Sequence, residues 1–360
     1  MAQLFAQVRC DVRNHRMWHS HFLNGPKQVN ITSPDILMPA GPRFDPAIGA
    51  WVLTRHVDVL TALREPRFTA NGARSGGELS RAEHTRFRAE ASKAAAEMLQ
   101  RLESQEPRVR SIASTLPRDR PVDLVSELAK PWSIEVARHL ACPTGNPEHI
   151  TALASDIFAA AAEPLDAALQ ADAEQATRDL AAAFAGELAA FRVQTFVALS
   201  QTLPCFLANA WLALLNDPGK TEMLRTEPAL MPAAIEELLR HSGPSRAQFR
   251  IAAERVTLGG ATIAEGDRIA LMLAAANRDP DQFRDPDRLD LHRDLPRHLA
   301  LGDGRHSCIG AGLVRAAAAT ATAAFIESFV AGRVEGPVEW QGGFAICAPA
   351  SLRVSRFGSG

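Results

Sequence analysis

The feature that most constrains the fold of this chain is a run without any charged residue, Phe196–Leu215. The run is long enough to cross a bilayer as a helix. It also contains a proline and polar side chains, which a lone helix in lipid would leave without hydrogen-bond partners: Ser200, Gln201, Thr202, Pro204 and Asn209. We therefore expect a buried central helix in a soluble protein, and the N-terminal sequence shows neither a signal-peptide core nor a membrane anchor.

The composition is ordinary for a globular protein with a large core, because 46% of the 360 residues are hydrophobic and 22% are charged. No linker divides the chain, so a single domain over residues 1–360 is expected. The net charge of −2 gives no indication of nucleic-acid binding. The five cysteines are scattered without a C-x-x-C pair, which predicts free thiols in a reducing compartment, the cytoplasm.

Local sequence patterns predict a mainly helical protein with a small β portion. Residues 1–50 look irregular because of their prolines, and the Gly/Ser/Arg-rich segment 71–77 is expected to be mobile. Helices are expected over 57–63, 81–102, 122–140, 147–160, a long stretch ending at Leu215, 232–241 and 311–325. Strands are expected over 50–54, 249–252, 256–258, 261–263, 268–273, 338–340 and 345–354.

A second constraint is the stretch 297–312, in which a glycine-containing loop passes into an alanine-rich helix. Gly302 and Gly304 allow a sharp turn and a close approach of the backbone to a flat ligand. Cys308 lies where this loop meets the helix N-terminus, and the helix dipole together with nearby basic side chains favours a thiolate there. A lone cysteine is usually a small buried hydrophobe, but this loop makes Cys308 a candidate nucleophile or metal ligand.

The loop resembles the haem-binding loop of the cytochromes P450, an aromatic residue followed by Gly-x-Gly-x-His/Arg-x-Cys-x-Gly. The matching positions are Gly302, Gly304, His306, Cys308 and Gly310. The resemblance implies that Cys308 is the axial thiolate ligand of haem b (iron protoporphyrin IX), with Gly302 and Gly310 beside the cofactor. Leu301 stands where the family has an aromatic residue that tunes the iron, a departure that concerns the redox potential and not the ligation.

Further motifs follow in the order of the same family. Residues 237–240 (Glu-Leu-Leu-Arg) match E-x-x-R, residues 276–280 match the A-N-R-D-P strand end, and residues 283–288 match the meander. A Glu–Arg pair at this spacing is common on helix surfaces and means little alone. In this order, the resemblance implies a buried pair of Glu237 and Arg240, completed by Arg288 or Arg293, that supports the haem loop.

Cationic side chains occupy the positions at which the family binds the two haem propionates. His84 and Arg88 are four residues apart and therefore share one face of the helix expected over 81–102. A solvated helix face is the alternative explanation for this pair. The resemblance implies that His84, Arg88, Arg250 and His306 donate hydrogen bonds to the propionates.

The central helix departs from the family at the positions that handle protons. Residues 198–202 (Ala-Leu-Ser-Gln-Thr) fall on the family's A/G-G-x-E/D-T motif, whose acid and alcohol relay protons during dioxygen activation. Thr202 is kept, whereas Gln201 replaces the acid and Leu199 the glycine; a slip of one helical turn is the alternative alignment. Pro204 follows, and a proline inside a helix frees a carbonyl and opens a kink. The resemblance implies catalytic roles for Gln201 and Thr202, with altered proton chemistry.

The resemblance covers nearly the whole chain from Trp51 onward. It implies the triangular-prism-like cytochrome P450 fold, mainly α with small β-sheets, with haem between the central helix and the Cys308 loop. The expected function is that of a bacterial-type monooxygenase that oxidises a small apolar or amphiphilic molecule with dioxygen and electrons from ferredoxin and ferredoxin reductase. The alternatives are a peroxide-using or radical-coupling haem-thiolate enzyme, motivated by Gln201, and a haem-binding relative without turnover.

Overall fold

The computed structural model describes residues 41–69, 81–184, 186, 188–294, 297–329 and 331–356. The chain divides into two compact units. Of the described residues, the first unit holds those within 41–69, 245–288 and 297–308, and the second holds those within 81–244, 289–294 and 309–356. The single domain expected for residues 1–360 stays a prediction.

The first unit is built on a mixed sheet. Its strands, in spatial order, are β1 (Arg43–Asp45), β2 (Ala50–Leu53), β8 (Arg268–Leu271), β5 (Gln248–Ala252) and β3 (Phe68–Thr69). β2 pairs with β8 in parallel, and the other neighbours are antiparallel. A separate antiparallel hairpin joins β6 (Val256–Leu258) to β7 (Ala261–Ile263). The sheet thus unites segments from distant parts of the sequence.

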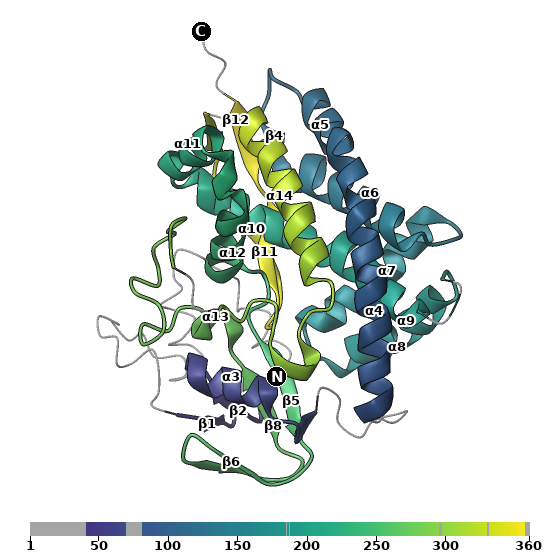
Figure 1. Cartoon of the computed structure of the whole chain (residues 1–360), viewed down its shortest axis with the longest axis vertical. Coiled ribbons are helices and arrows are strands. Elements are labelled where there is room, and N and C mark those ends of the chain that lie inside the picture. The colour runs from purple at the N-terminus through teal and green to yellow at the C-terminus, as the bar shows by residue number, and fades with distance from the viewer. Residues whose placement is uncertain are drawn as a thin grey trace. The chain divides into compact units, whose positions relative to one another are not determined.

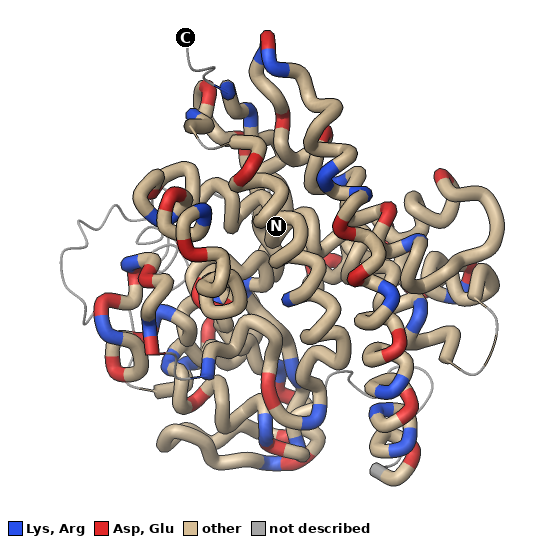
Figure 2. The backbone as a smooth tube through the Cα atoms, turned by 45° about the horizontal axis from the view of Figure 1, so that its top comes forward, with Lys and Arg blue, Asp and Glu red and all other residues tan. Residues whose placement is uncertain are grey.

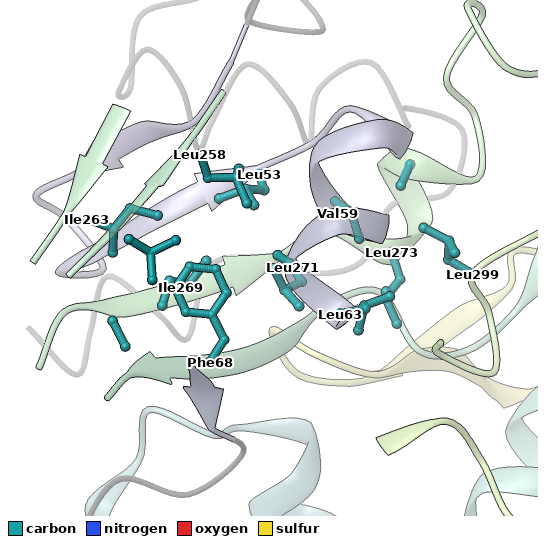
Figure 3. Close-up of a cluster of buried hydrophobic side chains, with 14 residues drawn as sticks. Leu53, Val59, Leu63, Phe68, Leu258, Ile263, Ile269, Leu271, Leu273 and Leu299 are labelled. Atoms are coloured by element: carbon teal, nitrogen blue, oxygen red, sulfur yellow. The ribbon is translucent and has the colours of Figure 1, made fainter. Parts of the chain in front are cut away.

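A short helix, α3 (His56–Arg64), covers this sheet and closes the core of the first unit. Figure 3 shows Val59 and Leu63 of α3 directed towards Leu271, Leu273 and Leu299. All five side chains are buried, and burial of each contributes about 1.5–3 kcal/mol. Because Leu299 belongs to the segment that leads to Cys308, the same core anchors the start of the cysteine loop. The helical turns α13 (Leu273–Ala276) and η7 (Gly304–His306) complete this unit.

The second unit is mainly helical, and Figure 1 shows α14 and α4 running side by side. Its longer helices are α4 (Arg81–Leu102), α5 (Glu106–Thr115), α6 (Lys130–Ala141), α7 (Pro147–Ala162), α8 (Ala167–Ala181), α11 (Pro218–Thr226), α12 (Met231–Ser242) and α14 (Ala311–Ser328). Short helical turns are η3 (Glu103–Gln105), η4 (Val125–Ala129) and η6 (Pro228–Leu230). Figure 2 shows positive and negative residues interspersed along the described parts of the chain.

Two small sheets accompany these helices. One has the strand order β4 (Val122–Asp123), β12 (Arg353–Arg356), β9 (Gly332–Val334), and the other is the hairpin of β10 (Glu339–Gly342) and β11 (Cys347–Ser351). The hairpin corresponds to the strand expected over 338–340 and to the first part of the strand expected over 345–354. The mainly α class with small β-sheets is confirmed.

The central helix consists of α9 (Ala189–Val197), η5 (Ala198–Thr202) and α10 (Leu203–Leu215). Its length and mean hydropathy of 1.4 would suit a membrane span, but 67% of the apolar window is buried inside the protein. Trp211 stacks on Phe325 of α14 with ring centroids 5.0 Å apart. The prediction of a buried central helix is confirmed, since an apolar helix covered by its own protein needs no lipid.

The structure differs from the sequence-based predictions in several local elements. The segment expected to be helical over 122–140 begins as the strand β4, and its first helical element, η4, begins at Val125. The strand expected over 345–354 is divided between β11 and β12, which belong to different sheets.

β1 lies inside the region expected to be irregular, and its flanking residues Pro42 and Pro46 are compatible with an edge strand. The strand expected over 268–273 ends at Leu271, because the alanine-rich segment that follows prefers a helical turn. The expectation of irregularity for residues 1–40 and of mobility for 71–77 lies outside the described residues.

The cysteines differ from expectation at one position. Cys347, at the start of β11, is disulfide-bonded, whereas Cys142, Cys205 and Cys308 are not. Spacing in the sequence could not exclude this bond, because a disulfide requires only that two Cα atoms approach to about 4.4–6.8 Å in the folded chain. The prediction of free thiols is wrong for Cys347, and Cys10 lies outside the described residues.

Candidate functional site

The Cys308 loop is closed by its own backbone. The Gly302 N–H donates to the carbonyl of Leu299, and the Cys308 N–H donates to the carbonyl of Leu301, both at 2.9 Å. The η7 turn lies within the segment that the Leu301–Cys308 bond closes, and Cys308 is half-buried. The loop therefore holds the half-buried Cys308 in a fixed place.

Gly304 allows this loop to pack directly on the end of α3. A Cβ built on Gly304 would lie 2.7 Å from the carbonyl oxygen of Leu63 and 3.2 Å from Cα of Arg64. Gly302 differs, because its added Cβ would meet nothing closer than 3.7 Å. Gly304 has a φ of +66° and Gly302 a φ of +69°, a backbone conformation that residues with a side chain disfavour. Gly304 is thus needed for close approach, and Gly302 for its backbone conformation.

Gly304→Ala should lower the free energy of unfolding by about 2–5 kcal/mol. The left-handed backbone contributes about 1–2 kcal/mol and the overlap with Leu63 about 1–3 kcal/mol. Gly260→Ala is the matched control, because Gly260 has φ +83° and nothing within 4 Å of an added Cβ. In chemical denaturation, Gly260→Ala should lower the free energy of unfolding only by the backbone contribution, about 1–2 kcal/mol. Equal losses of unfolding free energy in Gly304→Ala and Gly260→Ala would show that α3 moves away from the added methyl group without an energetic penalty.

A buried carboxylate ties the loop to α3. Asp303 accepts from Nε of Arg64 at 2.8 Å and from the Gly304 N–H at 2.5 Å. Nε of Arg297 lies 3.0 Å from its other oxygen. Burial opposes ionisation, but the hydrogen bond from Arg64, the Gly304 N–H and the two nearby positive charges hold the pKa of Asp303 below its ordinary value. Asp303 is therefore an ionised anchor of the cysteine loop.

The A-N-R-D-P segment, residues 276–280, fixes the other end of the same loop. The buried amide oxygen of Asn277 accepts from the Leu299 N–H at 2.6 Å. The carboxylate of Asp279 accepts from the backbone N–H of His56, at the start of α3, at 2.7 Å. This motif therefore joins the beginning of the loop to the helix on which the loop packs.

Arg250 places a buried positive charge next to the Cys308 loop. Only 6% of this residue is exposed, and burial lowers the pKa of its guanidinium. Its hydrogen bonds go to the carbonyl of Phe249 (2.7 Å) and to Oε1 of Gln248 (3.1 Å), and no carboxylate among the described residues pairs with it. Nε2 of Gln248 lies 3.9 Å from the position that a Cβ would take on Gly302. This edge of the loop is therefore rich in donors and lacks an acid.

These features of the first unit fit haem. A buried guanidinium without an acidic partner suits a ligand carboxylate such as a propionate. The described residues contain no group of three or more His, Cys, Asp or Glu side chains that could hold a metal ion. A metal bound by Cys308 would thus bring its other ligands with it, as porphyrin iron does.

The predicted site residues are distributed over both units. The first unit brings Gly302, His306 and Cys308 together in one loop and places Arg250 beside it through Gln248. The backbone carbonyl oxygen of His306 lies 3.8 Å from an added Cβ on Gly302.

The other predicted cofactor-binding residues belong to the second unit. His84 and Arg88 are half-buried and one turn apart on α4. Gly310 is the N-cap of α14, and a Cβ built on it would meet nothing within 4 Å. Their contact with haem stays a prediction.

The candidate proton-transfer residues lie in a π-helical turn of the central helix. The Leu203 N–H donates to the carbonyl of Ala198, five residues earlier. Gln201 and Thr202 are half-buried within this turn. The disturbance expected at Pro204 thus takes the form of a widened turn just before the proline. Such turns occur frequently at functional sites.

A buried thiol supports this turn. Sγ of Cys205 donates to the carbonyl of Gln201 at 3.3 Å. Burial raises the pKa of Cys205 to about 12, so the thiol keeps the proton that it donates. Cys205 is therefore a structural group of the central helix and no nucleophile.

The E-x-x-R pair is buried and forms the expected network. Arg240 donates to both carboxylate oxygens of Glu237, at 2.7 and 2.8 Å. Arg293 donates to the same carboxylate at 3.1 Å, and the Asp290 N–H does so at 2.9 Å. Burial opposes the charge of Glu237, but these donors hold its pKa below the ordinary value. The prediction of a buried pair is confirmed, and Arg293 is an arginine that completes it.

Two site residues were not predicted from the sequence. Gln248 stands two positions before Arg250, and alternate residues of a strand share a face, which is the signal that could have revealed it. Asp303 is an acid inside an otherwise basic loop, and its role depends on Arg64, which is far away in the sequence, as well as on the nearby Arg297.

Comparisons with known proteins agree with this geometry. A family model described as "Cytochrome P450" matches residues 219–335. The chain is 31% identical over 337 residues to cytochrome P450 107B1 of Saccharopolyspora erythraea, covering 78% of this chain and 82% of that protein. It is 32% identical over 326 residues to the vitamin D(3) 25-hydroxylase of Pseudonocardia autotrophica, covering 78% and 79%. The solved structure of the cytochrome P450 enzyme CYP109B1 from Bacillus subtilis matches with a TM-score of 0.75 and 26% identity, covering 87% of this chain and 95% of that one.

Proposed function

Because the chain belongs to the cytochrome P450 family of haem enzymes, we propose that it oxidises a small apolar or amphiphilic molecule with dioxygen. The electrons come from ferredoxin, which ferredoxin reductase reduces. The class of substrate is supported by the relatives' names, which include a vitamin D(3) 25-hydroxylase and a mycinamicin IV hydroxylase/epoxidase. The relatives are bacterial and the central helix is mostly buried, which supports a cytoplasmic enzyme without a membrane anchor.

We assign Cys308 as the axial ligand and place Gly302 and Gly310 beside the cofactor. Arg250, His306, His84 and Arg88 bind the propionates. The observation that carries this assignment is the buried guanidinium of Arg250, which pairs with no acid in the part of the chain that the structure describes and lies beside the Cys308 loop. The bound haem supplies the oxidising chemistry, with thiolate donation favouring cleavage of the O–O bond.

The chain's own residues bind, orient and move protons. Thr202 offers a hydroxyl that both donates and accepts, whereas the amide of Gln201 orients a hydrogen-bond chain but releases no proton. Proton delivery therefore relies on Thr202 and water.

Gln201 is also the observation that favours the second candidate, a peroxide-using or radical-coupling haem-thiolate enzyme. A haem-binding protein without turnover is the third. Consumption of dioxygen in proportion to product separates the monooxygenase from both.

The proposal is tested by reducing the purified protein under carbon monoxide. Thiolate ligation should give the strongly red-shifted Soret band of the carbonyl complex, and Cys308→Ala should abolish this band. Cys142→Ala is the control, because Cys142 is exposed and in no disulfide, and it should keep the band. A native spectrum without the shift, or a shift that survives Cys308→Ala, would overturn the assignment.

A further inference from the structure

The strand β5 fixes two neighbouring polar side chains of the first unit. Gln248 stands opposite Leu271 of β8, and Arg250 stands opposite Ile269. The two residues are alternate members of one strand, and their side chains meet in a hydrogen bond of 3.1 Å. Register and side-chain contact therefore define where the Gln248 amide lies.

The orientation of this amide follows from the chemistry of its partner. A guanidinium only donates, so the atom of Gln248 that faces Arg250 must be the carbonyl oxygen, Oε1. The NH₂ group is then left at the side of the Cys308 loop, where it lies 3.9 Å from an added Cβ on Gly302. It donates to no other described residue.

We propose that Gln248 is a positioning residue for the cofactor. Its Oε1 aligns the guanidinium of Arg250, and its Nε2 donates to the same haem propionate that Arg250 binds. This inference rests on the proposed role of Arg250. A carboxylate at this edge would receive two charge-assisted hydrogen bonds, one from the cationic guanidinium of Arg250 and one from the neutral amide of Gln248.

The amide suits this task better than an acid would. A glutamate at this position would also align Arg250, but it would neutralise the guanidinium and repel the propionate. It would offer no donor when ionised. The amide holds Arg250 without using its charge, so the full positive charge remains for the ligand.

The test is the rate at which the holoenzyme loses haem to excess apomyoglobin. At neutral pH, Gln248→Glu should lose haem roughly ten- to a hundredfold faster than the native protein, because a hydrogen bond to a charged group is lost and a like charge is added. As the pH falls and the new carboxyl takes up a proton, it becomes a donor again, and the rate should return towards the native value at the same pH. Gln248→Ala should also lose haem faster, but without that recovery.

Gln175→Glu is the control for the change of charge, since Gln175 is exposed on α8. It should lose haem at the native rate. A merely structural role for Gln248 would let the isosteric Gln248→Glu behave like the native protein at every pH, and that result would overturn the inference. If the native protein shows the thiolate spectrum but Gln248→Glu retains haem normally, the inference about Gln248 fails and the proposed function stands. If the native protein shows no thiolate-ligated haem, the proposed function has failed instead.

Discussion

Glu237→Gln should lower the free energy of unfolding by roughly 3–5 kcal/mol, as expected when one partner of a buried ion pair is removed. Glu237 and Arg240 are 1% and 2% exposed, and Arg293 shares the same carboxylate. The variant leaves two guanidinium groups with no anion between them. Urea denaturation of the purified protein measures the loss.

Glu222→Gln is the matched control for this experiment. Glu222 and Arg225 have the same spacing on α11, but their side chains are 52% and 45% exposed. Exposed pairs of this kind contribute about 0–1 kcal/mol. A loss of less than about 1 kcal/mol in Glu237→Gln, similar to the control, would contradict the role assigned to the buried network.

The native protein and Glu237→Gln should differ in how their stability changes as the pH falls. The pKa of Glu237 in the folded protein lies below its ordinary value of 4.5. Its contribution to stability is therefore complete above the pKa of the unfolded chain and is lost as the pH falls through the lower folded value. The difference in stability between native protein and Glu237→Gln should accordingly shrink in that acidic range.

Short-range features of this protein could be predicted from the sequence because they depend on neighbours along the chain. The absence of charge over Phe196–Leu215 required burial, and burial is what the structure shows. The spacing of Gly302, Gly304 and Cys308 predicted a tight loop before a helix, and both elements are present.

Long-range features could not be predicted in the same way. Glu237–Arg240 and Glu222–Arg225 have identical spacing, and only the packing of α12 makes the first pair buried. The role of Arg293 depends on where the segment after Arg288 passes α12. The approach of Gln248 to the loop needs β5 in its place beside β8.

The π-helical turn could be predicted from the sequence only in part. Pro204 indicated that the central helix would be disturbed, because proline cannot donate to a carbonyl one turn earlier. The sequence could not show how the helix would adjust. The structure shows that the Leu203 N–H reaches back to Ala198, which enlarges the turn around Gln201 and Thr202.

Gln201→Glu should change catalysis more than any other single substitution at the central helix. General acid–base groups contribute about a hundred- to ten-thousandfold in rate, and native Gln201 can orient a hydrogen-bond chain but cannot supply a proton. With the acid restored, we expect a larger share of the consumed electrons to appear in product and less to be lost as peroxide. Thr202→Ala should act in the opposite direction. Dioxygen uptake, peroxide and product, measured together, give this ratio.

Gln194→Glu is the control, because Gln194 is exposed on α9, earlier in the same helix. It adds the same charge and should leave the ratio unchanged. If Gln201→Glu abolishes the native product while dioxygen uptake rises, the amide serves a different chemistry, and the peroxide-using or radical-coupling alternative gains support. If Gln201→Glu and Thr202→Ala both leave rate, coupling and product as they are, neither side chain lies on the proton path. In that case the π turn orders the helix without delivering protons.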